Sequence, residues 1–192
     1  MTDRQHFATS ADAMKYLDAR LRSVVRSLGY KRARGTKLAY AKPSGRDDEF
    51  VVFGAVASRV GYDHFAGGLF RVELGLAPVP ELFAAARVGL VDLLSESDLE
   101  RYVGISRAVV AALPRPPDVH VEQFASTARD WYAKRFEPPA RGLRRTFYEW
   151  APFRSSDDLD AWSAFLAESL PSGLDRVARS SVDAGNLRLA PG

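Results

Sequence analysis

Hydrophobic residues between positions 11 and 28 recur every three or four residues, the spacing that places them on one face of an α-helix. This apolar stripe consists of Met14, Leu17, Leu21, Val24, Val25 and Leu28. Thr9 and Asp12 have the spacing of a capping box ahead of the stripe, and Gly29 follows it where a left-handed closing residue is favoured. The pattern predicts a first helix from Ala11 to Leu28.

Three strand-like segments come after this helix. Residues Lys37–Lys42 alternate between apolar and polar, and Leu69–Leu76 alternate with Arg71 and Glu73 pointing away from the apolar face. Between them, Phe50–Ala57 is almost wholly apolar, which is typical of a strand covered on both faces. These segments predict a short antiparallel meander.

The middle of the chain is predicted to be helical. Residues Glu81–Leu94 are rich in alanine, a strong helix former. A second helix is expected to begin with Ser97 as its N-cap and to stop before Pro114. A third helix is expected over Val119–Phe136, where apolar residues keep the helical period.

A fourth strand and a final helix are predicted in the last third of the chain. The strand is expected at Arg144–Trp150, after which Ser155 and Asp158 have capping-box spacing at the start of a helix. The apolar positions of this helix and its continuation are Leu159, Trp162, Phe165, Leu166, Leu170, Leu174 and Val177.

Separate runs of strands and helices favour an α+β fold over an alternating parallel one. We expect a small antiparallel sheet of about four strands, with an N-terminal helix, a helical middle segment and a C-terminal helix. The expected organisation is one globular domain at 10–182, with 81–139 as a helical insertion or layer, between an N-terminal tail at 1–9 and a C-terminal tail at 183–192.

Composition narrows the chemistry. The 192 residues include no cysteine, which excludes disulfides, thiolate nucleophiles and cysteine-ligated zinc or iron–sulfur sites. No apolar stretch approaches the ~20 residues that span a bilayer, and the first residues lack the apolar segment of a secretion signal. We therefore expect a cytoplasmic protein with no cofactor and no membrane partner.

Positive charge is concentrated in one window. The chain has 27 Lys and Arg against 24 Asp and Glu, yet Arg20–Lys42 holds eight basic residues and no acid. Such a window suits the acidic surface of a protein partner, or phosphates with tyrosine rings stacking on bases. The candidate binding residues are Arg22, Arg26, Tyr30, Lys31, Arg32, Arg34 and Lys37.

Two simpler interpretations of this window stay open. Arg22 and Arg26 fall on the solvent face of the first helix, where charge is expected in any case. Arginine richness is also typical of proteins from GC-rich genomes. Tyr40 alternates with the apolar face of its strand and is expected in the core.

The loop between the second and third predicted strands carries a further candidate site, Tyr62, Asp63 and His64. A carboxylate beside an imidazole could orient a general base, whereas the simpler interpretation is a polar loop tip that contributes to partner binding. The three histidines have no metal-ligand spacing, and the chain lacks both a Walker motif and a Gly-x-Ser-x-Gly elbow. No metal site is expected.

The run Leu28–Arg32 is followed by the strand with Leu38 and Tyr40 and by the run Phe70–Leu76. Together these segments resemble the uncharacterised bacterial domain-of-unknown-function 4304 family, over about half of the chain. The resemblance implies no catalytic residues. Because some members of that family are thought to lie near toxin genes, it implies an immunity-like binding role.

The absence of a catalytic constellation favours a non-catalytic protein-binding module, and the resemblance makes an immunity-type neutraliser of a toxin its specific form. The first alternative is a nucleic-acid-binding protein that uses the same Arg20–Lys42 surface. The second alternative is an enzyme with its site at the Tyr62–His64 loop.

Overall fold

The computed structural model describes Phe7 and residues 9–33, 38–46, 48–58, 67–112, 150–183 and 185–190. The elements in chain order are α1 (Ser10–Ser27), β1 (Lys31–Arg32), β2 (Ala39–Pro43), β3 (Phe50–Ala57), β4 (Gly68–Ala77), the 3₁₀ helix η1 (Leu82–Ala84), β5 (Ala86–Gly89), α2 (Leu90–Leu93), α3 (Glu96–Ala111), β6 (Ala151–Phe153), α5 (Ser156–Ala178), β7 (Ser181–Asp183) and β8 (Asn186–Arg188).

Within the described ranges, six strands form one antiparallel sheet, and five of them follow the order β1-β2-β3-β4-β5. The sixth strand, β6, pairs with the start of β4, and β5 pairs with its second half. The α+β fold is therefore confirmed, but the expectation of about four strands is wrong. Strands β1, β5 and β6, which the sequence did not predict, have two to four residues each, too few to show a periodic pattern.

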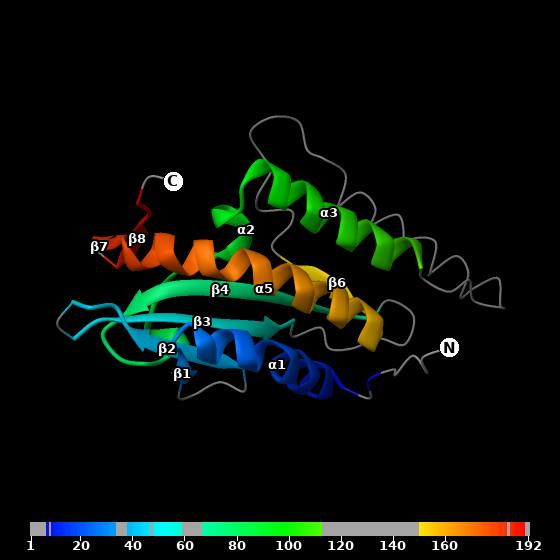
Figure 1. Ribbon diagram of the computed structural model, residues 1–192, viewed down its shortest axis with the longest axis horizontal. Helices are drawn as coiled ribbons and strands as arrows, with labels where there is room; N and C mark the ends of the chain where they lie inside the picture. The colour runs from blue at the N-terminus through cyan, green and yellow to red at the C-terminus, as the bar shows by residue number, and fades with distance from the viewer. Residues whose placement is uncertain are drawn as a thin grey trace.

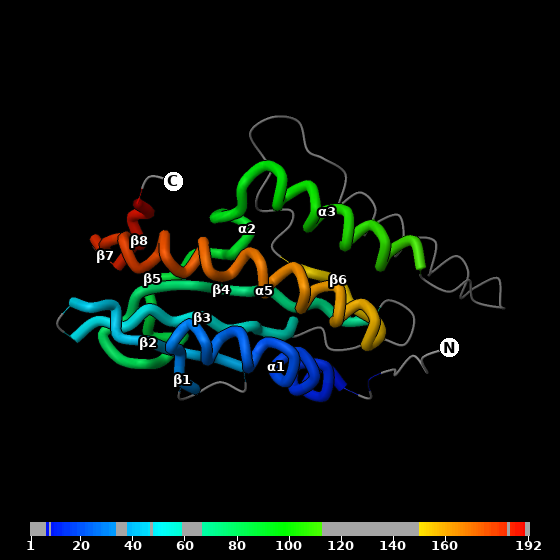
Figure 2. The backbone as a smooth tube through the Cα atoms, in the orientation of Figure 1, coloured from blue at the N-terminus to red at the C-terminus, as the bar shows by residue number. Residues whose placement is uncertain are grey.

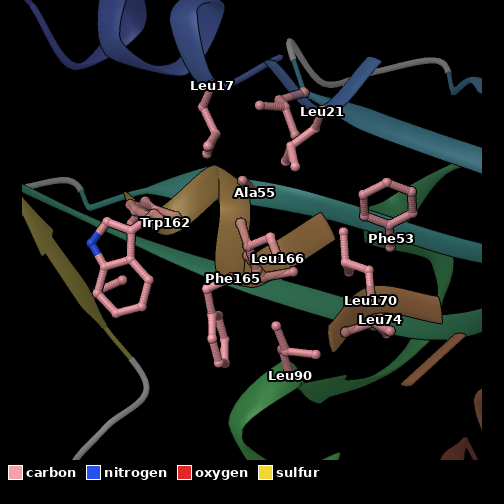
Figure 3. Packing of buried hydrophobic residues seen from close by; sticks show 14 of the residues in the cluster. Leu17, Leu21, Phe53, Ala55, Leu74, Leu90, Trp162, Phe165, Leu166 and Leu170 are labelled. Carbon is pink, nitrogen blue, oxygen red and sulfur yellow. The ribbon is translucent and has the colours of Figure 1, made fainter. Parts of the chain in front are cut away.

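Helices α1 and α5 lie side by side on one face of the sheet and run in the same direction (Figure 1). Helix α3 packs against α5 on the side away from α1 (Figure 2). The short helix α2 contacts β4, β5 and α5. Between helices and sheet, Leu17 of α1, Phe53 and Leu74 of the strands, and Trp162 and Leu166 of α5 belong to one hydrophobic cluster (Figure 3). The predicted apolar stripes of both helices therefore face one core.

The opposite face of the sheet carries a smaller cluster, in which Ala39, Val52 and Ala77 pack under Leu82 of η1. This arrangement confirms that β3 is covered on both faces. Glu73 lies on this second face, as predicted, but it is only 6% exposed, because Arg71 and Arg87 hold its carboxylate at 2.6 and 2.8 Å.

The helix predicted at Glu81–Leu94 is wrong. The segment forms η1, then β5 and then the short α2. Its alanines favour a helix locally, but residues 86–89 instead supply the edge strand that satisfies the backbone of β4, with Leu74 opposite Val88. Tertiary pairing overrides helix propensity here.

The predicted helix starts are confirmed at both ends of the chain. Thr9 Oγ1 accepts a hydrogen bond from the Asp12 amide, and Ser155 and Asp158 form a full capping box. Helix α3 is capped by Ser95 rather than Ser97, since Ser95 is the residue whose hydroxyl accepts from the amide three residues later.

Residues from both of the expected terminal tails belong to the folded structure. Phe7 is buried and packs edge-on against Tyr16 and Phe153. Strands β7 and β8, at 181–183 and 186–188 and mostly assigned above to a C-terminal tail, pair with each other in antiparallel fashion. The helix predicted at 119–136 and residues 144–149 of the predicted fourth strand lie outside the described residues.

Candidate partner-binding surface

The basic window folds around the end of α1. Gly29 has φ 85°, the left-handed conformation predicted for a closing residue, and it turns the chain from α1 into the edge strand β1. The Tyr30 amide bonds to the Val25 carbonyl, which anchors this turn. Lys31 and Arg32 then project from the edge of the sheet next to the last turn of α1.

Asp18 gathers three side chains of the window. Its carboxylate lies 2.8 Å from Arg22 and 2.5 Å from Arg32, and it accepts a hydrogen bond of 2.6 Å from the Tyr40 hydroxyl. Asp18 itself is 4% exposed. The arrangement ties α1 to β1 and β2, and it neutralises part of the positive charge that the sequence concentrates here.

Burial alone would raise the pKa of Asp18. Hydrogen bonds from Tyr40 and Arg22, together with the charge of Arg32, outweigh that effect, so the pKa of the Asp18 carboxyl is lowered. Asp18 was not among the candidate residues, because it lies two positions before the acid-free window. The i,i+4 spacing of Asp18 and Arg22 is the sequence signal that reveals the pair.

Arg20 is also compensated. Its guanidinium lies 2.9 Å from Asp160 of α5, and it donates to the Tyr16 hydroxyl at 2.7 Å. This contact joins the two long helices. Arg20 therefore belongs to the packing of α1 against α5.

Arg26 and Lys31 are exposed, and their charges have no partner among the residues that the structure describes. Lys42 is exposed too, although its Nζ donates to the Leu28 carbonyl at 3.0 Å and lies 5.8 Å from the centre of the Tyr30 ring. These three residues, called the basic rim below, are the part of the window whose charge faces solvent with no carboxylate among the described residues against it.

The two tyrosines of the window are buried. Tyr30 is 6% exposed and meets the Phe53 ring edge-on. Tyr40 is 2% exposed and stacks on the Phe53 ring, with 5.5 Å between the ring centroids. Burial, with the charge of Asp175, raises the pKa of Tyr30 to about 12. Tyr40 thus lies in the core, as expected, and the Tyr30 ring is not presented as a stacking platform.

Two adjoining hollows open at this surface. The Arg26 hollow, of about 400 Å³, is lined by Arg26, Gly29, Tyr30, Lys31 and Arg32. The Leu174 hollow, of about 220 Å³, lies between β2, β3 and α5 and is lined mainly by Leu28, Tyr30, Val51, Pro171, Leu174 and Lys42. Tyr30 is common to both, so the two hollows are neighbours.

The remaining candidate residues, Arg34, Lys37, Tyr62, Asp63 and His64, lie outside the described residues. Among the residues that are described, no group of His, Asp and Glu has the arrangement of a metal site. In the same part of the chain, no helix combines the length and apolar character needed to cross a bilayer.

Comparisons with protein-family models, with curated proteins and with solved structures found no match for this chain. The resemblance to the domain-of-unknown-function 4304 family therefore stays a prediction, and the functional argument depends on the surface itself.

Proposed function

We propose that this protein is a non-catalytic module that binds an acidic protein partner through the basic rim, Arg26, Lys31 and Lys42. The observation that carries the proposal is the contrast within one window. Arg20, Arg22 and Arg32 are held by carboxylates, whereas Arg26 and Lys31 lie beside a hollow with no acid among the described residues to offset them.

An electrostatic rim of this kind acts mainly on the rate of association. Exposed charges steer an oppositely charged partner and exclude partners of like charge. An immunity-type neutraliser of a toxin is the specific form of this function that the sequence resemblance implies. Such a role requires binding alone, so it is compatible with a surface that offers charge and shape.

Nucleic acid is the weaker alternative partner. Sequence-tolerant binding of single strands depends on aromatic rings on which bases stack, and both tyrosines of this surface are buried. Phosphate contacts would still release counterions, so a nucleic-acid partner would show affinity that falls steeply with salt. The enzyme alternative at the Tyr62–His64 loop concerns residues outside the described part of the chain and stays a prediction.

The test is capture of partners from native cells with tagged protein at low salt, with and without nuclease. Three proteins are compared: the native chain, the double variant R26E/K31E and the control R107E. Arg107 is an exposed arginine on α3 with no partner among the described residues, so R107E alters charge away from the rim.

We expect the native chain and R107E to retain a stoichiometric protein that survives nuclease, and R26E/K31E to lose it. Retention of that protein by R26E/K31E would remove the basic rim from the binding surface. Nuclease-sensitive material as the sole product would replace the protein partner with nucleic acid.

A further inference from the structure

A surface that binds its partner by charge alone does not need a recess such as the Leu174 hollow. Three separate elements of the fold nevertheless form this hollow. The C-terminal turns of α1 and α5 meet there, opposite the hairpin that joins β2 and β3. Lys42 caps the Leu28 carbonyl at the end of α1. Arg46 of the hairpin donates to the carbonyls of Ala178 and Ser180 at 3.2 and 2.7 Å, at the end of α5.

These caps occupy the backbone acceptors, so apolar side chains form the larger part of the wall of the hollow, beside Lys42, Ser44 and Asp175. Backbone acceptors at helix ends would otherwise attract water or a cation, and here lysine and arginine already occupy them. Asp175 at the rim of the hollow is paired with Arg179 at 2.8 Å, so its charge is also offset. The apolar surface that remains for a ligand belongs mainly to Leu28, Pro43, Pro171 and Ala178, which surround the buried Val51 and Leu174.

The size of the hollow suits one side chain. Pockets that bury a drug-sized ligand have roughly 300–1,000 Å³, whereas this hollow has about 220 Å³. Interfaces between proteins commonly depend on one large apolar or aromatic residue that fills such a recess, surrounded by charged contacts. The Arg26 hollow next to it supplies those charges through Arg26 and Lys31.

We infer that the partner presents an acidic segment with one large apolar side chain, which inserts into the Leu174 hollow while its neighbouring carboxylates lie against Arg26 and Lys31. This inference rests on the proposed function and specifies the chemistry of its partner. The shared wall at Tyr30 places the apolar and the charged contacts within the reach of adjacent residues of one chain.

The inference is tested with three short peptides, acetylated and amidated, and the native full-length protein labelled with ¹⁵N. The first peptide is Asp-Glu-Phe-Glu-Asp, the second replaces its phenylalanine with alanine, and the third replaces its acids with lysine and arginine. Binding is followed from the backbone amide shifts of Tyr30, Lys42 and Leu174.

We expect the acidic phenylalanine peptide to shift these amides in a saturable way and to bind about tenfold more tightly than its alanine counterpart, the effect of burying a phenylalanine side chain. The basic peptide is expected not to bind. Equal affinity of the phenylalanine and alanine peptides, shifts confined to other regions, or no binding by any peptide would each overturn the inference.

A filling variant locates the apolar contact. Ala178 lines the hollow and is partly exposed, so A178F should occupy it and reduce the affinity of the phenylalanine peptide to that of the alanine peptide. If A178F does not fold, the peptide comparison on the native protein still decides. Loss of the captured partner in R26E/K31E combined with equal peptide affinities would retain the proposed function and reject the apolar anchor.

Discussion

Individual side chains of α1 determine which charges of the basic window face a partner. Asp18 holds Arg22, Arg32 and the Tyr40 hydroxyl, and these contacts replace the water that burial removes from its carboxylate. Because the pKa of Asp18 is lowered in the folded protein, the charged form contributes to stability at neutral pH. The contact with Asp18 also holds Arg32 in place at the wall of the Arg26 hollow.

Replacing Asp18 with asparagine is expected to destabilise the protein by about 2 kcal/mol at pH 7, because two guanidinium groups lose their carboxylate. The measurement is urea unfolding of the native chain and D18N between pH 7 and pH 2.5. The folded pKa lies below the unfolded value of 3.8, so the contribution of Asp18 is present above pH 3.8 and is lost as pH falls through the folded pKa.

The free energies of unfolding of the two proteins should therefore converge at the acid end of this range. The control D12N changes a carboxylate on the same helix that is more exposed than Asp18, and its effect should be smaller at every pH. A difference between native protein and D18N that stays constant down to pH 2.5 would contradict the assigned role of Asp18.

Helix ends are the element-scale feature that shapes the surface. Helix α1 is followed by the left-handed Gly29, and Lys42 donates a hydrogen bond to the Leu28 carbonyl at its end. At the end of α5, Arg46 of the β2–β3 hairpin donates to the Ala178 carbonyl. Each helix stops where a strand or turn supplies a cation for its last carbonyls, which also suits the negative end of the helix dipole. The two hollows lie between these ends.

Gly29→Ala and Gly104→Ala are expected to have opposite effects on stability. At Gly29 the φ of +85° disfavours any side chain, and an added Cβ would meet Lys42 Cε at 3.4 Å, so a loss of about 1–2 kcal/mol is expected. At Gly104 a Cβ meets nothing within 4 Å, and alanine in the middle of α3 should stabilise by about 0.5–1 kcal/mol.

Thermal and urea unfolding measure both effects. A G29A variant as stable as the native chain would show that the turn after α1 relaxes without the left-handed conformation, and the lysine cap would then need another explanation.

At the scale of the whole molecule, one core connects elements from both halves of the described chain. Leu90 and Tyr102 of α2 and α3 belong to the same cluster as Leu17 of α1 and Leu166 of α5. The centroids of the Tyr102 and Trp162 rings lie 4.7 Å apart. The described part of the 81–139 segment is therefore packed into the main core, an arrangement that the sequence had left open.

We expect the protein to unfold in a single transition, because helices and sheet share this core. Far-UV circular dichroism, which follows helices, and near-UV circular dichroism, which follows packed aromatic rings, should give coincident curves. Tyr102→Ala should shift both curves together and lower the free energy of unfolding by about 3–5 kcal/mol. A separate early transition that Tyr102→Ala alone shifts would indicate that α3 is an independent layer.

Local patterns determined the long elements. The stripe of α1, the buried run of β3, the alternation of β4 and the capping box of α5 each involve enough residues for a period or a cap to stand out, because side-chain burial on one face imposes that period. The concentration of charge after Arg20 was equally visible, as was the absence of cysteine chemistry.

Tertiary structure alone decided what depends on residues far apart in the chain. Strand β5 forms from an alanine-rich segment because β4 has an unpaired edge, and Asp18 neutralises Arg32 across 14 positions because α1 lies over β1 and β2. The Leu174 hollow joins residues 28 and 174 in the same way. Sequence periodicity reports which face of an element is buried, and only packing reports which faces meet.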